Sequence, residues 1–181
     1  MHALEPASTG RSTCRACRTR ITKGALRFGE RGLNPYGEGE STFWFHPACA
    51  AFKRPEAFSS LQEDEELAAL VEPMHRDRAR AGVASPRLAR LSGGQRAKSG
   101  RARCRACRER IEKDAWRVAI DIWEEGRFAP LGWLHAGCVL QYAQVQAIGD
   151  VVDRVLHFTA GDVDAADLRA VLSAATPAEL G

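Results

Sequence analysis

All six cysteines of the sequence and two of its five histidines fall into two matched sets of four residues. Each set begins with a Cys-x-x-Cys pair and ends, after 28 or 27 intervening residues, with a His-x-x-Cys pair. Thiolate and imidazole are ligands that Zn²⁺ prefers, and four of them close a tetrahedral site that leaves no position for water. We therefore predict two structural zinc ions, bound by Cys14, Cys17, His46 and Cys49, and by Cys104, Cys107, His135 and Cys138.

The two sets belong to a sequence duplication. The first two cysteines of the second set each lie 90 residues after their counterparts in the first set. The histidine and the last cysteine each lie 89 residues after theirs. The stretch from Cys14 to Arg27 matches the stretch from Cys104 to Arg117. Disulfides or a redox-active Cys-x-x-Cys are the alternatives, but neither needs a histidine three residues before each late cysteine. Metal-bound thiolates explain the pattern better.

Thiolates of this kind suit a reducing compartment. Residues 1–13 lack the apolar stretch of a secretory signal, and no apolar run is long enough for a membrane span. We expect an intracellular protein, located in the nucleoid or cytoplasm of a bacterium or in the nucleus of a eukaryote.

The elements that must hold these ligands follow from the spacing. The residues between the two ligand pairs of each set suffice for a pair of strands that leaves the metal and returns. Apolar periodicity predicts helices at residues 61–72, 139–157 and 163–174. Ser59 or Ser60 and Asp162 are the expected N-caps of the first and last helix. Pro73 is expected to end the first helix, and Gly149 lies near an interruption of the second.

These elements predict two zinc modules, at residues 11–72 and 101–176. Residues 1–10 are expected to be a flexible N-terminus and 177–181 a tail. Residues 73–100 are expected to be a basic flexible linker, because residues 73–103 contain nine Lys or Arg, one acid and no aromatic residue.

The distribution of charge says more than the formal net charge of +3. Residues 11–54 contain nine basic and three acidic side chains, and residues 96–142 contain ten and six. The segment 143–181 is acidic, with two basic and six acidic side chains. We infer that the zinc modules face a polyanion; a solvated arginine-rich surface is the alternative.

The ligand order, the tryptophan two residues before each ligand histidine, and the Ile-x-Lys-x-x-Leu-Arg string that ends at Arg27 together resemble the zinc finger of poly(ADP-ribose) polymerases (PARPs). The resemblance covers about residues 11–70 and 101–172. It implies small α+β modules, each with a short antiparallel sheet around a Cys₃His zinc site and C-terminal helices. Trp44 and Trp133 are assigned to the core because an aromatic residue next to a ligand more often packs than binds.

The PARP-type finger recognises DNA strand breaks by structure. Carried over to this sequence, the resemblance implies phosphate contacts from Arg11, Arg27, Arg101 and Arg117. It also implies a side chain that stacks on an exposed base, for which the loops offer Tyr36 in the first module and Trp123 and Phe128 in the second. The same loops contain acids that repel phosphate: Glu38, Glu40, Glu124 and Glu125.

From this resemblance we expect a non-catalytic protein with two tandem fingers that binds nicks, gaps or ends of DNA and acts as a sensor or recruiter in DNA repair. Nothing in the sequence resembles the transferase or ligase domains of the family. Three alternatives stay open: an adaptor that binds a protein through the acidic C-terminal helices, an RNA-binding module, and a nuclease. Closed zinc sites disfavour the nuclease.

Overall fold

The computed structural model describes residues 2–35, 37–161 and 164–174, which form two compact units. Unit 1 comprises Met1–Ala84 and Trp123–Ala129, and unit 2 comprises Ser85–Ile122 and Pro130–Gly181. Each unit contains a three-stranded antiparallel sheet and one set of cysteine and histidine ligands. The predicted fold class, small α+β zinc modules, is therefore confirmed.

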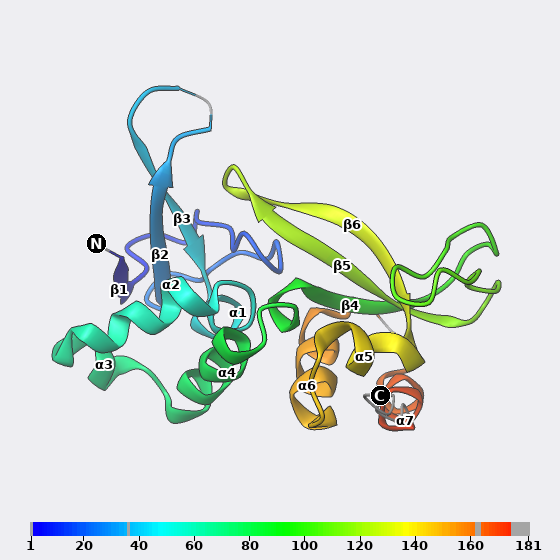
Figure 1. The fold of residues 1–181 in the computed structure, drawn as a ribbon. Coiled ribbons are helices and arrows are strands. Elements are labelled where there is room, and N and C mark those ends of the chain that lie inside the picture. Colours follow the sequence, from blue (N-terminus) through cyan, green and yellow to red (C-terminus); the bar gives the residue numbers. More distant parts are fainter. Residues whose placement is uncertain (1, 36, 162–163, 175–181) are drawn as a thin grey trace. The chain divides into compact units, whose positions relative to one another are not determined.

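The sheet of unit 1 consists of β1 (Ala3–Pro6), β2 (Leu26–Leu33) and β3 (Glu40–Phe45), which are blue to cyan in Figure 1. Phe28 pairs with Leu4 on one side and with Phe45 on the other. The phenylalanine rings of Phe28 and Phe45 are fully buried, and the ring of Phe28 meets that of Phe58 at 5.4 Å. These rings form the core under the helices.

Five short helical segments follow the sheet of unit 1: α1 (Pro47–Lys53), α2 (Pro55–Ser59), the 3₁₀ turn η1 (Ser60–Glu63), α3 (Glu65–Leu70) and α4 (Pro73–Ala84). A proline opens α1, α2 and α4, where its missing N–H costs nothing. The helix predicted at 61–72 is therefore wrong at both ends: α3 ends at Leu70, and Pro73 opens α4. Neither Ser59 nor Ser60 caps α3. Asp64 caps α3 by accepting hydrogen bonds from the N–H groups of Glu66 and Leu67, at 3.0 and 3.1 Å.

The sheet of unit 2 consists of β4 (Leu91–Arg96), β5 (Trp116–Glu124) and β6 (Arg127–His135). After η3 (Ala136–Cys138) come α5 (Val139–Ala143), α6 (Ile148–Phe158) and α7 (Ala165–Ser173), coloured yellow to red in Figure 1. The helix predicted at 139–157 is split before Gly149, because Gln144 adopts a left-handed conformation at φ 57°. Asp164 caps α7, and the predicted cap Asp162 lies outside the described residues.

Two segments expected to be flexible form regular structure. Residues 73–100 hold α4, the 3₁₀ turn η2 (Leu88–Arg90) and β4, and residues 1–10 hold β1. Small buried residues explain α4: Ala79 and Gly82 let the helix approach its neighbours closely. The arginines of α4 also pack, since the Arg78 guanidinium lies 4.7 Å from the centre of the Phe52 ring. The expected tail 177–181 lies outside the described residues.

Strands β1 and β4 extend the duplication towards the N-terminus. Glu5 of β1 pairs with Arg27 of β2, and Gln95 of β4 pairs with Arg117 of β5, at the same offset of 90 residues. In β4 the chain passes so close to α6 that a Cβ atom on Gly93 would lie 2.2 Å from the carbonyl oxygen of Phe158. Each module therefore has one strand more than the pair expected between its ligands.

Candidate metal centres and nucleic-acid interface

Each Cys-x-x-Cys pair lies in a tight loop that begins at its first cysteine. In unit 1 the N–H of Cys14 donates to the carbonyl of Thr19 at 2.9 Å. In unit 2 the N–H of Cys104 donates to the carbonyl of Glu109 at 2.8 Å. Arg18 and Arg108 turn these loops with left-handed φ angles of 62° and 68°. The loops thus present two sulfurs each towards one point.

The remaining ligands come from the end of each hairpin. His46 follows β3 and Cys49 lies in α1, while His135 ends β6 and Cys138 ends η3. In each unit, the four ligand atoms lie within 4.8 Å of one another. Strands and helices that are distant in sequence therefore bring together the two predicted quartets.

The distances fit zinc. The Nδ1 atom of His46 lies 3.4 Å from the sulfur of Cys17 and 3.9 Å from that of Cys49. The corresponding distances from His135 to Cys107 and Cys138 are 3.3 and 3.9 Å. A tetrahedral zinc ion requires about 3.6 Å between a ligand sulfur and a ligand nitrogen. The prediction of two zinc sites is confirmed; bound zinc supplies a rigid cross-link in each module.

Groups around the second site fix the state of its ligands. His135 Nε2 lies 2.9 Å from the carbonyl oxygen of Arg110, so an N–H at this position leaves Nδ1 free to bind metal. Burial raises the pKa of Cys104, but hydrogen bonds from backbone N–H groups have the larger effect and lower the pKa to about 7. One of these donors is the N–H of His135, whose nitrogen lies 3.4 Å from the Cys104 sulfur. In the first site, hydrogen bonding to Cys14 and Cys17 raises the pKa of His46 to about 10. Zinc must displace such protons, so its affinity rises with pH.

Arg27, one of the predicted phosphate contacts, is largely buried at 7% exposure. Its guanidinium donates to Ser12 Oγ at 2.7 Å and to Glu5 Oε1 at 2.6 Å, and it lies 3.6 Å from the centre of the Trp44 ring. The carboxylate of Glu5 is 47% exposed. Arg27 thus already has an acid, a hydroxyl and a ring as partners.

Arg117 holds the equivalent position in unit 2 with different neighbours. Its guanidinium lies 3.8 Å from the centre of the Trp133 ring, but Gln95 and Ala102 replace the acid and the hydroxyl. The described residues provide neither a hydrogen bond nor an ion pair to this guanidinium. Burial lowers the pKa of Arg117, although an arginine stays charged in proteins. Arg117 is thus a half-buried cation that has no anionic partner among the described residues of unit 2.

The other predicted DNA contacts lie in different surroundings. Arg11 and Arg101 are exposed on the loops that lead into the zinc sites, and Tyr36 lies outside the described residues. Trp123 and Phe128 are half-buried in unit 1, where the Trp123 ring lies 4.8 Å from Phe128 and 5.4 Å from Phe43. These contacts were not expected from the sequence. DNA contact by all of these residues stays a prediction.

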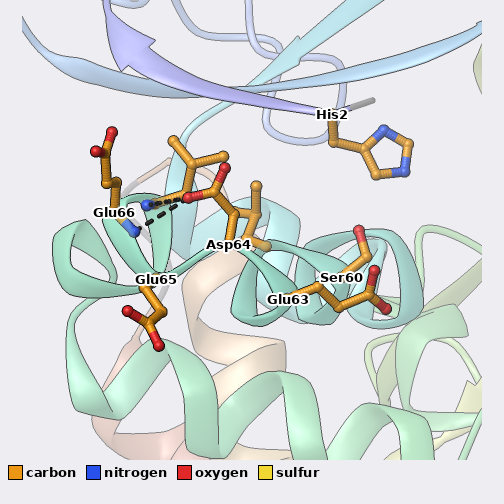
Figure 2. Close-up of a pocket in the computed structure, with 8 residues that line it drawn as sticks. His2, Ser60, Glu63, Asp64, Glu65 and Glu66 are labelled. Atoms are coloured by element: carbon orange, nitrogen blue, oxygen red, sulfur yellow. Dashed lines mark hydrogen bonds between the residues drawn. The ribbon is translucent and has the colours of Figure 1, made fainter.

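The acids form features of their own. Figure 2 shows a hollow of unit 1 that is lined by Glu63, Asp64, Glu65 and Glu66 together with His2, and none of its described lining residues is Lys or Arg. This face repels phosphate. In unit 2, Asp167 of α7 accepts a 2.6 Å hydrogen bond from Trp116 Nε1 and pairs with Arg96, so this acid stabilises the module.

Comparisons with known proteins agree with the metal sites. Residues 5–76 match the family described as "Poly(ADP-ribose) polymerase and DNA-Ligase Zn-finger region". The poly [ADP-ribose] polymerase of Drosophila melanogaster is 30% identical over 159 residues, which cover 77% of this chain and 16% of that protein. Poly [ADP-ribose] polymerase 1 of Oryza sativa subsp. japonica is 30% identical over 155 residues, which cover 80% of this chain and 15% of that protein. The chain therefore spans only about a sixth of the length of these relatives. Within the described residues, no helix combines the length and apolarity needed to cross a membrane.

Proposed function

We propose that this protein binds DNA strand breaks through its two zinc modules, because residues 5–76 match the zinc-finger family of poly(ADP-ribose) polymerases and DNA ligases. Nicks, gaps and ends are recognised by their structure and not by base sequence. The observation that carries the proposal is the guanidinium of Arg117, which lies over Trp133 without a partner among the described residues. A DNA phosphate supplies the missing anion, since the planar guanidinium matches two phosphate oxygens.

The two modules contribute unequally in this proposal. Arg101 and Arg117 of unit 2 contact the phosphate backbone, as does Arg11 of unit 1. Arg27 acts mainly by supporting its module, because Glu5 and Ser12 already accept its hydrogen bonds. The second module therefore supplies two of the three arginines proposed to contact phosphate.

Base stacking by aromatic side chains is the second part of the proposal. Tyr36, Trp123 and Phe128 are the candidates. Stacking on an unpaired base contributes about 1–3 kcal/mol, and an aromatic pair in a protein about 0.5–1.5 kcal/mol. A base that replaces Phe43 against the Trp123 ring therefore offsets the loss of that one contact.

We further propose that the protein binds and recruits, and does not catalyse. Closed zinc sites leave no coordination position for a reactive water. The matched part of the relatives is their zinc-finger region. Such a protein acts in DNA repair and resides with the DNA, in the nucleus of a eukaryote or the nucleoid of a bacterium.

A mobility-shift panel tests the proposal with zinc-loaded protein. The substrates are intact, nicked and gapped duplexes of one length, a hairpin end, and single-stranded RNA, each at two salt concentrations. We expect the nicked and gapped duplexes to bind more tightly than the intact duplex. Equal affinity for all DNA substrates would reduce the function to electrostatic adhesion, preference for the RNA would support an RNA-binding module, and no binding would support the protein adaptor.

A further inference from the structure

We propose that a hollow beside the second zinc site binds a phosphate group of DNA, through Arg103, Arg105 and Arg108. This inference rests on the proposed function and adds a site to it. The hollow has a volume of about 360 Å³, and Ala102, Gly132, Trp133 and the zinc ligand Cys104 also line it. Among the described residues, its lining contains three arginines and neither Asp nor Glu. The charge of the hollow therefore selects an anion.

Backbone contacts orient two of the three guanidinium groups. Arg105 Nε donates to the carbonyl of Leu131 at 2.8 Å, and Arg103 Nη1 donates to that of Arg108 at 3.2 Å. A guanidinium has five N–H groups, so each of these side chains retains donors for a ligand. None of the three arginines forms an ion pair with the described residues. A phosphate thus meets cations that are partly fixed and not neutralised.

Gly132 keeps the hollow open. A Cβ atom at this position would lie 2.9 Å from Arg105 Nε, and the φ angle of 127° also disfavours a side chain. The equivalent residue of the first module is Phe43, whose ring lies 5.4 Å from the guanidinium of Arg15, the counterpart of Arg105. Thr13 stands where the second module has Arg103. The two modules therefore differ at this place, since the second has Gly132 and Arg103 where the first has Phe43 and Thr13.

The hollow adjoins the DNA contact already proposed. Trp133 lines the hollow, and the guanidinium carbon of Arg117 lies 3.8 Å from the centre of the ring of the same tryptophan. A phosphate in the hollow and a second one at Arg117 are thus held around a single tryptophan. The hollow can take either a terminal phosphate at the break or a phosphate of the continuous backbone.

Paired double substitutions test the site in the zinc-loaded full chain. Arg103→Thr with Arg108→Asn empties the hollow of two cations, and Arg15→Thr with Arg18→Asn removes the same charge from the first module. Asparagine is used at positions 108 and 18 because it tolerates their left-handed φ angles. We expect the first pair to lower the salt slope of nicked-duplex binding by about 0.9, and hence the affinity about eightfold at 0.1 M salt, for one lost phosphate contact. The control pair should change both less. Equal effects of the two pairs, with two zinc ions retained, would overturn the proposal.

The source of the phosphate follows from a nicked duplex with or without its 5′-phosphate. If the hollow takes a terminal phosphate, loss of the 5′-phosphate weakens DNA binding by the unsubstituted protein but not by the hollow variant. If the hollow takes a backbone phosphate, the loss changes the affinity of neither protein. A separate readout needs no DNA: inorganic phosphate should shift the Arg105 Nε–H resonance more than that of Arg15. Equal shifts would contradict the site even where break binding holds, whereas a shift without break binding would contradict the proposed function alone.

Discussion

The contrast between Arg27 and Arg117 predicts that one arginine stabilises its module and the other does not. Arg27→Ala removes the hydrogen bonds to Glu5 and Ser12 and the contact with the Trp44 ring. We expect a loss of about 3 kcal/mol, because a hydrogen bond to a charged group contributes about 1.5–3 kcal/mol and the Glu5 carboxylate left behind is half-exposed and can be solvated. Arg117→Ala loses the contact with Trp133, worth about 1–2 kcal/mol. The two losses should differ by about 2 kcal/mol.

Amide hydrogen exchange read by mass spectrometry measures this difference in one chain, because peptides from β2 and β5 report on separate modules. Glu5→Gln is the matched control: it gives the first module the residue that the second has at Gln95, and it should cost about 1 kcal/mol. Losses for Arg27→Ala and Arg117→Ala that agree within about 0.5 kcal/mol would refute the reasoning, since the Glu5 and Ser12 contacts would then add nothing.

Three further predictions concern charge, pH and metal. Gln95→Glu places a carboxylate opposite Arg117 and should weaken nicked-duplex binding about eightfold in a mobility shift, by occupying one phosphate-binding cation; unchanged affinity would argue against Arg117 as a contact. Burial lowers the pKa of His75, so the unfolded chain binds the proton more tightly and stability should fall below about pH 6.5. His75→Leu should reduce the dependence of the unfolding free energy on pH, measured by urea unfolding. An equal dependence in the variant would show that another group causes it. The Cys104→Ala variant should lose the zinc ion of unit 2 and, with it, folding free energy on the order of 10 kcal/mol, so that unit 2 unfolds. Elemental analysis should still find one zinc ion, bound in unit 1. Loss of both ions would show that the sites are coupled.

The ligands were predictable because their chemistry permits little variation. A zinc quartet needs two close pairs, and the offsets of 90 and 89 residues repeat that requirement in the second half. Strands β2 and β3 followed from the same constraint, since the chain must leave the metal and return. The aromatic and β-branched residues of β3 and β5 also favour strands, whereas β2 contains one aromatic residue and two glycines.

Strands β1 and β4 were missed because only pairing makes them strands. Their sequences contain proline or a pair of glycines, which are unfavourable in isolated strands. Helix α4 was missed because its contacts come from alanine, glycine and arginine stems, which composition assigns to solvent. The pairing of Glu5 with Arg27 was not predicted, because β1 was not predicted. Extending the 90-residue offset to Glu5 and Gln95 would have revealed both the strand and the difference between the modules.

Native mass spectrometry tests the central claim most directly, with the protein mixed with equal amounts of nicked and intact duplex of one length. The account predicts that the main complex contains one chain, two zinc ions and the nicked duplex. A complex without zinc, or one that contains both duplexes in equal amounts, would contradict it.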